Sequence, residues 1–138
     1  MIYQYYPQVP HGYKFELNKD MNFSAAHYIP VEAAGKCQRV HGHTYVINLT
    51  ICGNDLDEAG FLVDFKQLKT LVHDRYDHTL LNEHAEFNGG SDRFPSTEVV
   101  ARTIWEIVQE HLDTKSNQPR CVQVIVRETP TSYVTYRP

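Results

Sequence analysis

The chain of 138 residues is long enough for one hydrophobic core but not for two, and its apolar share of 41% and charged share of 22% are those of an ordinary globular protein. Its net charge of −4 argues against nucleic acid as a partner, because binding to phosphates requires a basic surface. No apolar run approaches the roughly 18 residues that cross a bilayer, so no association with a membrane is expected. Three cysteines are too few for a disulfide framework, and this small, odd number favours a reducing compartment and a cytoplasmic location.

The N-terminal segment and the first strand differ sharply in pattern. Residues 1–12 are rich in Tyr and Pro and predict an extended arm, which leaves 13–138 as a single catalytic domain. Over 13–27 apolar residues recur at alternate positions, which predicts a strand with one polar interruption at Lys19, where we expect a bulge or a bend. If the alternation continues through it, His27 lies on the apolar face.

A His-x-His pair opens the second predicted strand. After a loop over 30–36, His41 and His43 lead into the alternating segment 43–53, and in a strand their imidazoles leave the same face. Antiparallel pairing with the first strand brings His27 beside them. Three imidazoles leave one position of a tetrahedral zinc open, which is the layout of a catalytic site. An isolated His-x-His pair is more often a surface or core pair, but the third histidine and Cys37, four residues before His41, favour a metal here.

Two helices are predicted in the middle of the chain. The first follows the cap residue Asp64, with Gln67 completing a capping box, and ends around Tyr76. The second begins at 95–98, where a cap residue precedes an acidic first turn. The predicted buried stripes are Phe65, Leu68, Leu71 and Val72 in the first helix, and Val100, Ile104, Ile107, Val108 and Leu112 in the second.

Two further strands, 121–128 and 131–136, complete the predicted order ββααββ. Strands that flank paired helices predict an α+β fold, with an antiparallel four-stranded sheet and two helices on one face. Such a sheet keeps two open edges unless neighbouring subunits cover them. We therefore expect an oligomer.

Cys37 leaves three interpretations open. It is a loop thiol without a role, a fourth zinc ligand that closes a structural site, or a thiolate that acts as base or nucleophile. Lys36 and Arg39 beside it favour the thiolate. Asp77 and His78 place a carboxylate next to an imidazole, and this pair indicates a function only if folding brings it to the thiol of Cys37.

Glu128 shares its strand parity with Val126 and should point to the buried face, where a carboxylate needs a partner with donors. Cys52 and Cys121 fall in strands and are predicted to fill the core. The remaining histidines are predicted to be surface residues: His11, His73, His84 and His111.

Six motifs in this order resemble the 6-pyruvoyltetrahydropterin synthase family, from about Phe15 to the C-terminus. They are Phe23-Ser-Ala-Ala-His27, Cys37-(three residues)-His41-Gly-His43, Val63-Asp64-Phe65, Asp77-His78, Ser96-Thr97-Glu98 and Arg127-Glu128-Thr129-Pro130. The match is closest to the bacterial branch, the 6-carboxy-5,6,7,8-tetrahydropterin synthases of queuosine biosynthesis. Animal-type pyruvoyl enzymes usually carry a longer insert between the cysteine and the His-Gly-His, and a folate branch typically has Glu instead of the cysteine.

The resemblance implies a tunnelling fold, in which subunits join their sheets into a barrel of trimers, commonly paired into hexamers with active sites at subunit boundaries. It implies a zinc-dependent lyase that acts on 7,8-dihydroneopterin triphosphate and, in the carboxy branch, releases triphosphate and acetaldehyde. Zinc would act as a Lewis acid on the hydroxyls of the substrate side chain. The implied zinc ligands are His27, His41 and His43.

The resemblance also implies roles for the other singled-out residues. Cys37, as a thiolate, would abstract a proton from the side chain of the substrate. Asp77 and His78 of a neighbouring subunit would relay protons. Glu128 would accept the two adjacent N–H groups of the pterin, a paired contact that fixes orientation. Ser96 and Thr97 (96–97) match the family's pterin-contacting position at a helix start.

Other functions remain open. One is a true 6-pyruvoyltetrahydropterin synthase, and another is a non-catalytic zinc-binding oligomer in which Cys37 closes the coordination. A cupin-like module is disfavoured, because Ile47 and Asn48 stand where that motif requires Glu. Imidazole ligands also suit iron, copper and nickel, so the pattern does not fix the metal.

Overall fold

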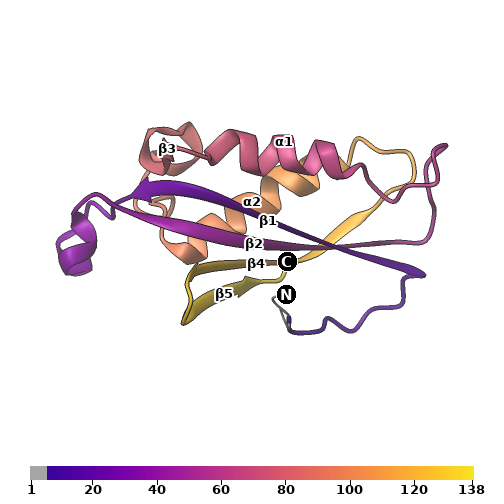
Figure 1. The fold of residues 1–138 in the computed structure, drawn as a ribbon, viewed down its shortest axis with the longest axis horizontal. Helices are drawn as coiled ribbons and strands as arrows, with labels where there is room; N and C mark the ends of the chain where they lie inside the picture. Colours follow the sequence, from indigo (N-terminus) through magenta and orange to yellow (C-terminus); the bar gives the residue numbers. More distant parts are fainter. Residues whose placement is uncertain (1–5) are drawn as a thin grey trace.

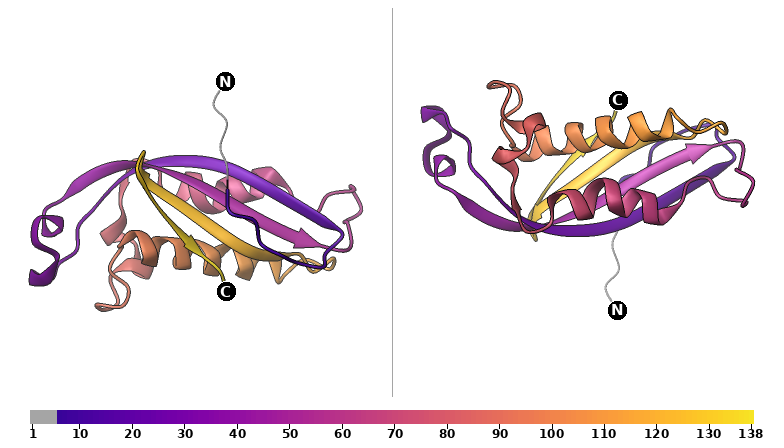
Figure 2. Two further views of the ribbon diagram at one scale, coloured as in Figure 1. Left: turned by 90° about the horizontal axis from the view of Figure 1, so that it is seen from below. Right: turned by 90° about the horizontal axis from the view of Figure 1, so that it is seen from above.

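The computed structural model describes residues 6–138 as a twisted five-stranded sheet with two long helices (Figure 1). The strand order is β3-β1-β2-β4-β5, so β2 is central. Both helices cover the same face of the sheet (Figure 2), and the predicted α+β class is confirmed. The elements are β1 (Phe15–His27), η1 (Glu32–Gln38), β2 (His41–Gly53), α1 (Phe65–Tyr76), β3 (Thr79–Leu80), η2 (Leu81–Glu83), η3 (Ala85–Phe87), α2 (Thr97–Leu112), β4 (Arg120–Thr129) and β5 (Ser132–Tyr136), where η marks a 3-10 helix.

The long hairpin of β1 and β2 has an unbroken antiparallel register that ends with His27 opposite His41. The bulge predicted at Lys19 is wrong, since this residue pairs regularly. Its ammonium group instead lies 5.4 Å from the ring centroid of Phe65 on α1, so that the aliphatic stem covers apolar surface. Phe65 itself is half exposed rather than buried as predicted.

The four predicted strands are present and pair antiparallel, but the sheet has a fifth strand, so the prediction of a four-stranded sheet in the order ββααββ is wrong. Between the helices the chain forms β3, a two-residue strand that pairs in parallel with Ala25 and Ala26 of β1. His78, with φ of 59°, turns the chain out of α1, and its N–H donates a hydrogen bond of 2.7 Å to the carbonyl of Ser24. A two-residue strand has no periodicity, and the sequence pattern could not reveal it.

The helices begin where the sequence predicts. The side chains of Asp64 and Ser96 accept hydrogen bonds from backbone N–H groups in the first turns of α1 and α2, and α1 ends at Tyr76. The predicted capping box is incomplete, because the Gln67 side chain hydrogen-bonds to the His111 ring at 3.1 Å. Within residues 6–138 no helix has the length and apolar character needed to cross a membrane.

One hydrophobic core lies between the sheet and the helices. As predicted, Cys52 and Cys121 are buried, and both are free thiols. Trp105 joins α2 to β4 by donating from its indole N–H to the carbonyl of Cys121 at 2.8 Å. Of the four histidines predicted at the surface, His11 is exposed, but the other three are half-buried because each ring has hydrogen-bond partners on a neighbouring segment: His73, His84 and His111.

The predicted N-terminal arm is described in part. Residues 1–5 lie outside the described residues. Residues 6–12 form neither helix nor strand and run along the sheet face that the helices leave open (Figure 2). There the side-chain amide of Gln123 donates to the carbonyl of Pro7 at 2.9 Å, and the ring of His11 hydrogen-bonds to Glu16 at 2.9 Å.

Candidate metal centre

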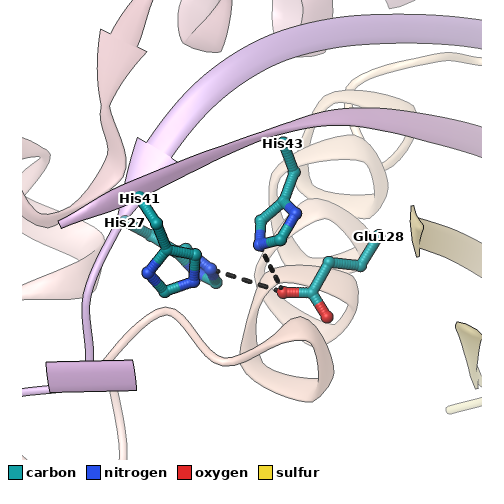
Figure 3. A group of neighbouring side chains, drawn as sticks. All are labelled: His27, His41, His43 and Glu128. Carbon is teal, nitrogen blue, oxygen red and sulfur yellow. Dashed lines mark ion pairs between the residues drawn. The ribbon is translucent and has the colours of Figure 1, made fainter. Parts of the chain in front are cut away.

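Three histidines converge where β1 ends and β2 begins (Figure 3). The register places His27 directly opposite His41, and His43 follows two residues later on the same face. The ring centroids are 4.5 Å apart for His27 and His41, 5.1 Å for His27 and His43, and 5.0 Å for His41 and His43. The predicted hairpin pairing is therefore confirmed, whereas cation binding by these rings stays a prediction.

Backbone carbonyls orient two of the rings. Nδ1 of His27 lies 2.7 Å from the carbonyl oxygen of Pro95, and Nδ1 of His41 lies 2.6 Å from that of Arg39. Because a carbonyl only accepts, we assign the proton to Nδ1 in both rings, which leaves Nε2 with a free lone pair. Burial lowers the pKa of His27, although the Pro95 carbonyl opposes this shift, so the ring favours its neutral form. Metal-binding histidines commonly have such carbonyl partners.

The free nitrogens face a carboxylate. Nε2 of His27 and of His43 are buried without a hydrogen-bond partner. Oε1 of Glu128 lies 3.3 Å and 3.1 Å from them, and because Nε2 of His27 carries a lone pair, this nitrogen and the carboxylate oxygen both accept and share no proton. The ligand atoms of His27, His41, His43 and Glu128 all lie within 4.8 Å of one another. Three imidazoles and a carboxylate fit a divalent cation such as zinc.

Tyr45 forms the inner wall of this cluster and was missed from the sequence. Its ring lies 5.6 Å from His43 and 5.8 Å from His27, and it stacks on Phe23 at 5.1 Å. The ring is fully buried, its hydroxyl has no hydrogen-bond partner, and burial raises its pKa. Its strand parity with His43 was a usable signal. The two carbonyl partners had none, because every residue carries a carbonyl.

Cys37 lies outside the cluster. It belongs to η1, an exposed segment that connects β1 to β2 and extends beyond the end of the sheet (Figure 1). Gly35, with φ of 57° and ψ of −123°, bends this segment in a conformation that favours glycine. The carbonyl of Cys37 accepts from the N–H of Ile29 at 2.7 Å, which fixes the base of the loop. The thiol is exposed, and the four-residue ligand group contains no sulfur.

Asp77 and His78 lie at the end of α1, beside β1. Oδ1 of Asp77 accepts from the N–H of Ser24 at 2.9 Å, and this bond lowers the pKa of the carboxyl. Oδ2 lies 3.5 Å from Nε2 of His78 and 3.6 Å from Nε2 of His73. The side chain of His78 is 85% exposed. It borders a shallow depression whose floor consists of small residues facing away from the helices: Ser24, Ala26, Gly42 and Thr44.

Ser96 and Thr97 begin α2 next to the metal centre, because the preceding Pro95 contacts His27. The Ser96 hydroxyl accepts from the N–H of Val99 at 3.2 Å and thus caps the helix. Thr97 is buried. The structure therefore brings this helix start to the cluster, while its contact with a pterin stays a prediction.

Fold and site together define a class: an α+β protein whose twisted sheet carries a histidine cluster at one end and two helices on one face. The sequence profile of the 6-pyruvoyl tetrahydropterin synthase family matches residues 16–138. The chain belongs to this family.

Named relatives extend this result. The chain is 62% identical over 140 residues to the 6-carboxy-5,6,7,8-tetrahydropterin synthase of Bacillus subtilis, an alignment that covers 100% of this chain and 95% of that protein. It is 31% identical over 126 residues to the Synechocystis protein of the same name, covering 86% of this chain and 89% of that protein. Among solved structures, the Caenorhabditis elegans 6-pyruvoyl tetrahydropterin synthase superposes with a TM-score of 0.68 at 28% identity, covering 90% of this chain and 95% of that chain.

Proposed function

We propose that the chain is a 6-carboxy-5,6,7,8-tetrahydropterin synthase of the queuosine pathway. It converts 7,8-dihydroneopterin triphosphate and one water into 6-carboxy-5,6,7,8-tetrahydropterin, triphosphate and acetaldehyde. No redox cofactor is required, because the ring is reduced at the expense of its own side chain. The observation that carries the proposal is the full-length identity of 62% with the Bacillus subtilis protein of that name.

The histidine cluster supports a metal-dependent reaction. His27, His41 and His43 would hold the cation through Nε2, with two of the rings fixed by backbone carbonyls. Zinc suits this donor set, and when bound it supplies Lewis-acid stabilisation of negative charge on the side-chain oxygens of the substrate. The buried ring of Tyr45 keeps water from the inner side of the cluster.

The two groups that would transfer protons, the Cys37 thiol and the His78 ring, lie outside the hydrophobic core of their own subunit. The Cys37 thiol, which would take the side-chain proton, stands on the segment that extends beyond the sheet. His78, which would relay protons with Asp77, is exposed at the sheet edge. A site completed by a neighbouring subunit explains both positions. The protein would then act as a homo-oligomer in the cytoplasm, with a hexamer of two trimers as the expected state.

The pterin ring would be held by Glu128 and by the start of α2. A carboxylate that accepts two adjacent N–H groups fixes the orientation of the ring. Thr97 and the cap Ser96 stand next to the Pro95 carbonyl that holds His27, so a pterin at this helix start would lie close to the cation.

Acetaldehyde release tests the proposal directly. Purified zinc-loaded protein is incubated with 7,8-dihydroneopterin triphosphate, acetaldehyde is followed by a coupled alcohol dehydrogenase, and the pterin product is identified by mass. Stoichiometric acetaldehyde and a carboxylated pterin are expected. A pyruvoyl product without acetaldehyde would instead indicate a 6-pyruvoyltetrahydropterin synthase, and no product at all would indicate a non-catalytic zinc protein.

The role of the thiol has its own test. Cys37→Ala should keep its zinc content while turnover falls by about a hundredfold or more, as for loss of a catalytic proton-transfer group. Glu32→Ala serves as the control, because Glu32 is an exposed residue of the same segment. Loss of zinc from Cys37→Ala would favour a structural site with a sulfur ligand.

A further inference from the structure

The carboxylate of Glu128 points towards the three imidazoles, and its oxygen and their nitrogens form one group of possible ligand atoms (Figure 3). We propose that Glu128 binds the cation in the substrate-free protein and leaves it when the carboxylate takes up the pterin. The exchange with pterin rests on the function proposed above, whereas the contact with the cation does not.

Two distances support the cation contact. Zinc bonds of about 2.0–2.1 Å place neighbouring ligand atoms of a tetrahedron about 3.3–3.4 Å apart. Oε1 of Glu128 lies 3.1 Å from Nε2 of His43 and 3.3 Å from Nε2 of His27. Both distances are close to the spacing that a shared tetrahedral cation would require between the carboxylate oxygen and the imidazole nitrogens.

The charge balance points the same way. Among the described residues, Glu128 forms no ion pair with any lysine or arginine, and its close partners are His27 and His43. His27 is the more buried of the two and carries its proton on the far nitrogen, toward Pro95. The Nε2 lone pair of His27 and the carboxylate oxygen therefore face each other across a partly buried space, an arrangement that is unfavourable until a cation enters.

The backbone at Glu128 explains how the carboxylate reaches the cluster and how it could leave. In the pairing of β4 with β5, the register shifts between Arg127 and Thr129, so Glu128 is the extra residue of a bulge. The pairing of β4 with β2 also ends at Arg127. A bulge redirects its side chain, and a residue without a partner on either side can rotate without breaking the sheet.

The cation and the pterin compete for the same carboxylate, that of Glu128. If Glu128 must leave the cation to accept the pterin, each ligand lowers the affinity for the other, and by the same factor. The resting protein thus holds its cation with four side-chain ligands, and it opens the fourth position only when a pterin is present.

Zinc affinity without substrate tests the cation contact. Zinc-free protein is titrated with zinc against a chelator. Glu128→Gln should bind zinc at least about tenfold more weakly than the wild type, which is the size of loss seen when a group that supports a metal site is removed. Glu110→Gln is the control, because this exposed glutamate of α2 removes the same charge away from the cluster. Equal zinc affinity of Glu128→Gln and wild type would overturn the proposal.

Competition tests the exchange, and it uses the wild type alone, so it stands even if Glu128→Gln does not fold. Unsubstituted pterin should weaken zinc binding, and zinc should weaken pterin binding by the same factor. Pterin that leaves the zinc affinity unchanged or raises it would overturn the exchange. If the wild type releases acetaldehyde but Glu128→Gln binds zinc as tightly as the wild type, only this inference is refuted. If Glu128→Gln binds zinc more weakly but the wild type shows no turnover, only the proposed enzyme activity is refuted.

Discussion

The side chain of Glu86 holds the segment that leads to Pro95 against helix α1 through an ion pair and hydrogen bonds. The substitution Glu86→Gln removes the negative charge from this contact. The carboxylate accepts hydrogen bonds from Nε and Nη2 of Arg75 at 2.7 Å and 2.9 Å, and from the hydroxyl of Tyr76 at 2.7 Å. Burial raises the pKa of Glu86, but the hydrogen bonds from Arg75 and Tyr76 outweigh burial and lower the pKa to about 2.

The size of the effect follows from this shift. A fall from 4.5 to about 2 corresponds to at most about 3.5 kcal/mol of stability, at about 1.4 kcal/mol per unit. The side chain of Glu86 is 17% exposed but that of Arg75 is 45% exposed, so solvent weakens the pair. We therefore expect Glu86→Gln to lose about 2 kcal/mol of unfolding free energy near neutral pH.

The pH dependence separates this charge effect from a packing defect. Because the folded-state pKa lies below the unfolded one, the contribution is complete above about pH 4.5 and disappears as the pH falls towards 2. The gap between wild type and Glu86→Gln should shrink below about 1 kcal/mol near pH 3. Urea unfolding of metal-free protein at a fixed concentration, followed by the fluorescence of Trp105, measures it. Glu110→Gln is the control, and a gap that does not change with pH would refute the reasoning.

Three further outcomes are expected. Asn82→Ala should lose about 2–3 kcal/mol in urea unfolding, because its side chain bonds the backbone N–H and carbonyl of Tyr28 at 3.0 Å and 2.8 Å; a loss below about 0.5 kcal/mol would contradict this. Gly53→Ala should lose about 1–2 kcal/mol, since its Cβ would stand 2.6 Å from Cδ1 of the buried Leu62; an unchanged melting temperature would argue against this packing. Iodoacetamide near neutral pH should modify Cys37 alone in the folded protein, because burial raises the pKa of the two strand thiols to about 11 and about 12; mass spectrometry that finds a second modified thiol would show otherwise.

The sequence predicted the parts of the site that depend on periodicity. Strand alternation puts His41 and His43 on one face, and antiparallel pairing then brings His27 to them, as the register confirms. The same parity argument directed Glu128 to the buried face. Helix caps were readable for a similar reason, since a cap is a side chain at a fixed offset from the helix start.

Features that depend on backbone groups or on single long-range contacts escaped prediction. The carbonyls of Pro95 and Arg39 orient two rings, and no residue type announces them. Lys19 broke the apolar alternation and suggested a bulge, yet its long stem lets a charged residue occupy an apolar face. The proximity of Glu128 to the imidazoles depends on an irregularity in strand pairing that only the folded chain reveals.

The contact between the His27 ring and the main chain at Pro95 has a consequence for how this protein can diverge. Every amino acid offers the same carbonyl, so point substitutions at position 95 leave the acceptor in place. A one-residue insertion or deletion between His84 and Pro95 would instead shift the chain and remove the oxygen from the ring. The number of residues between His84 and Pro95, and not the identity of residue 95, is therefore what the contact with His27 requires.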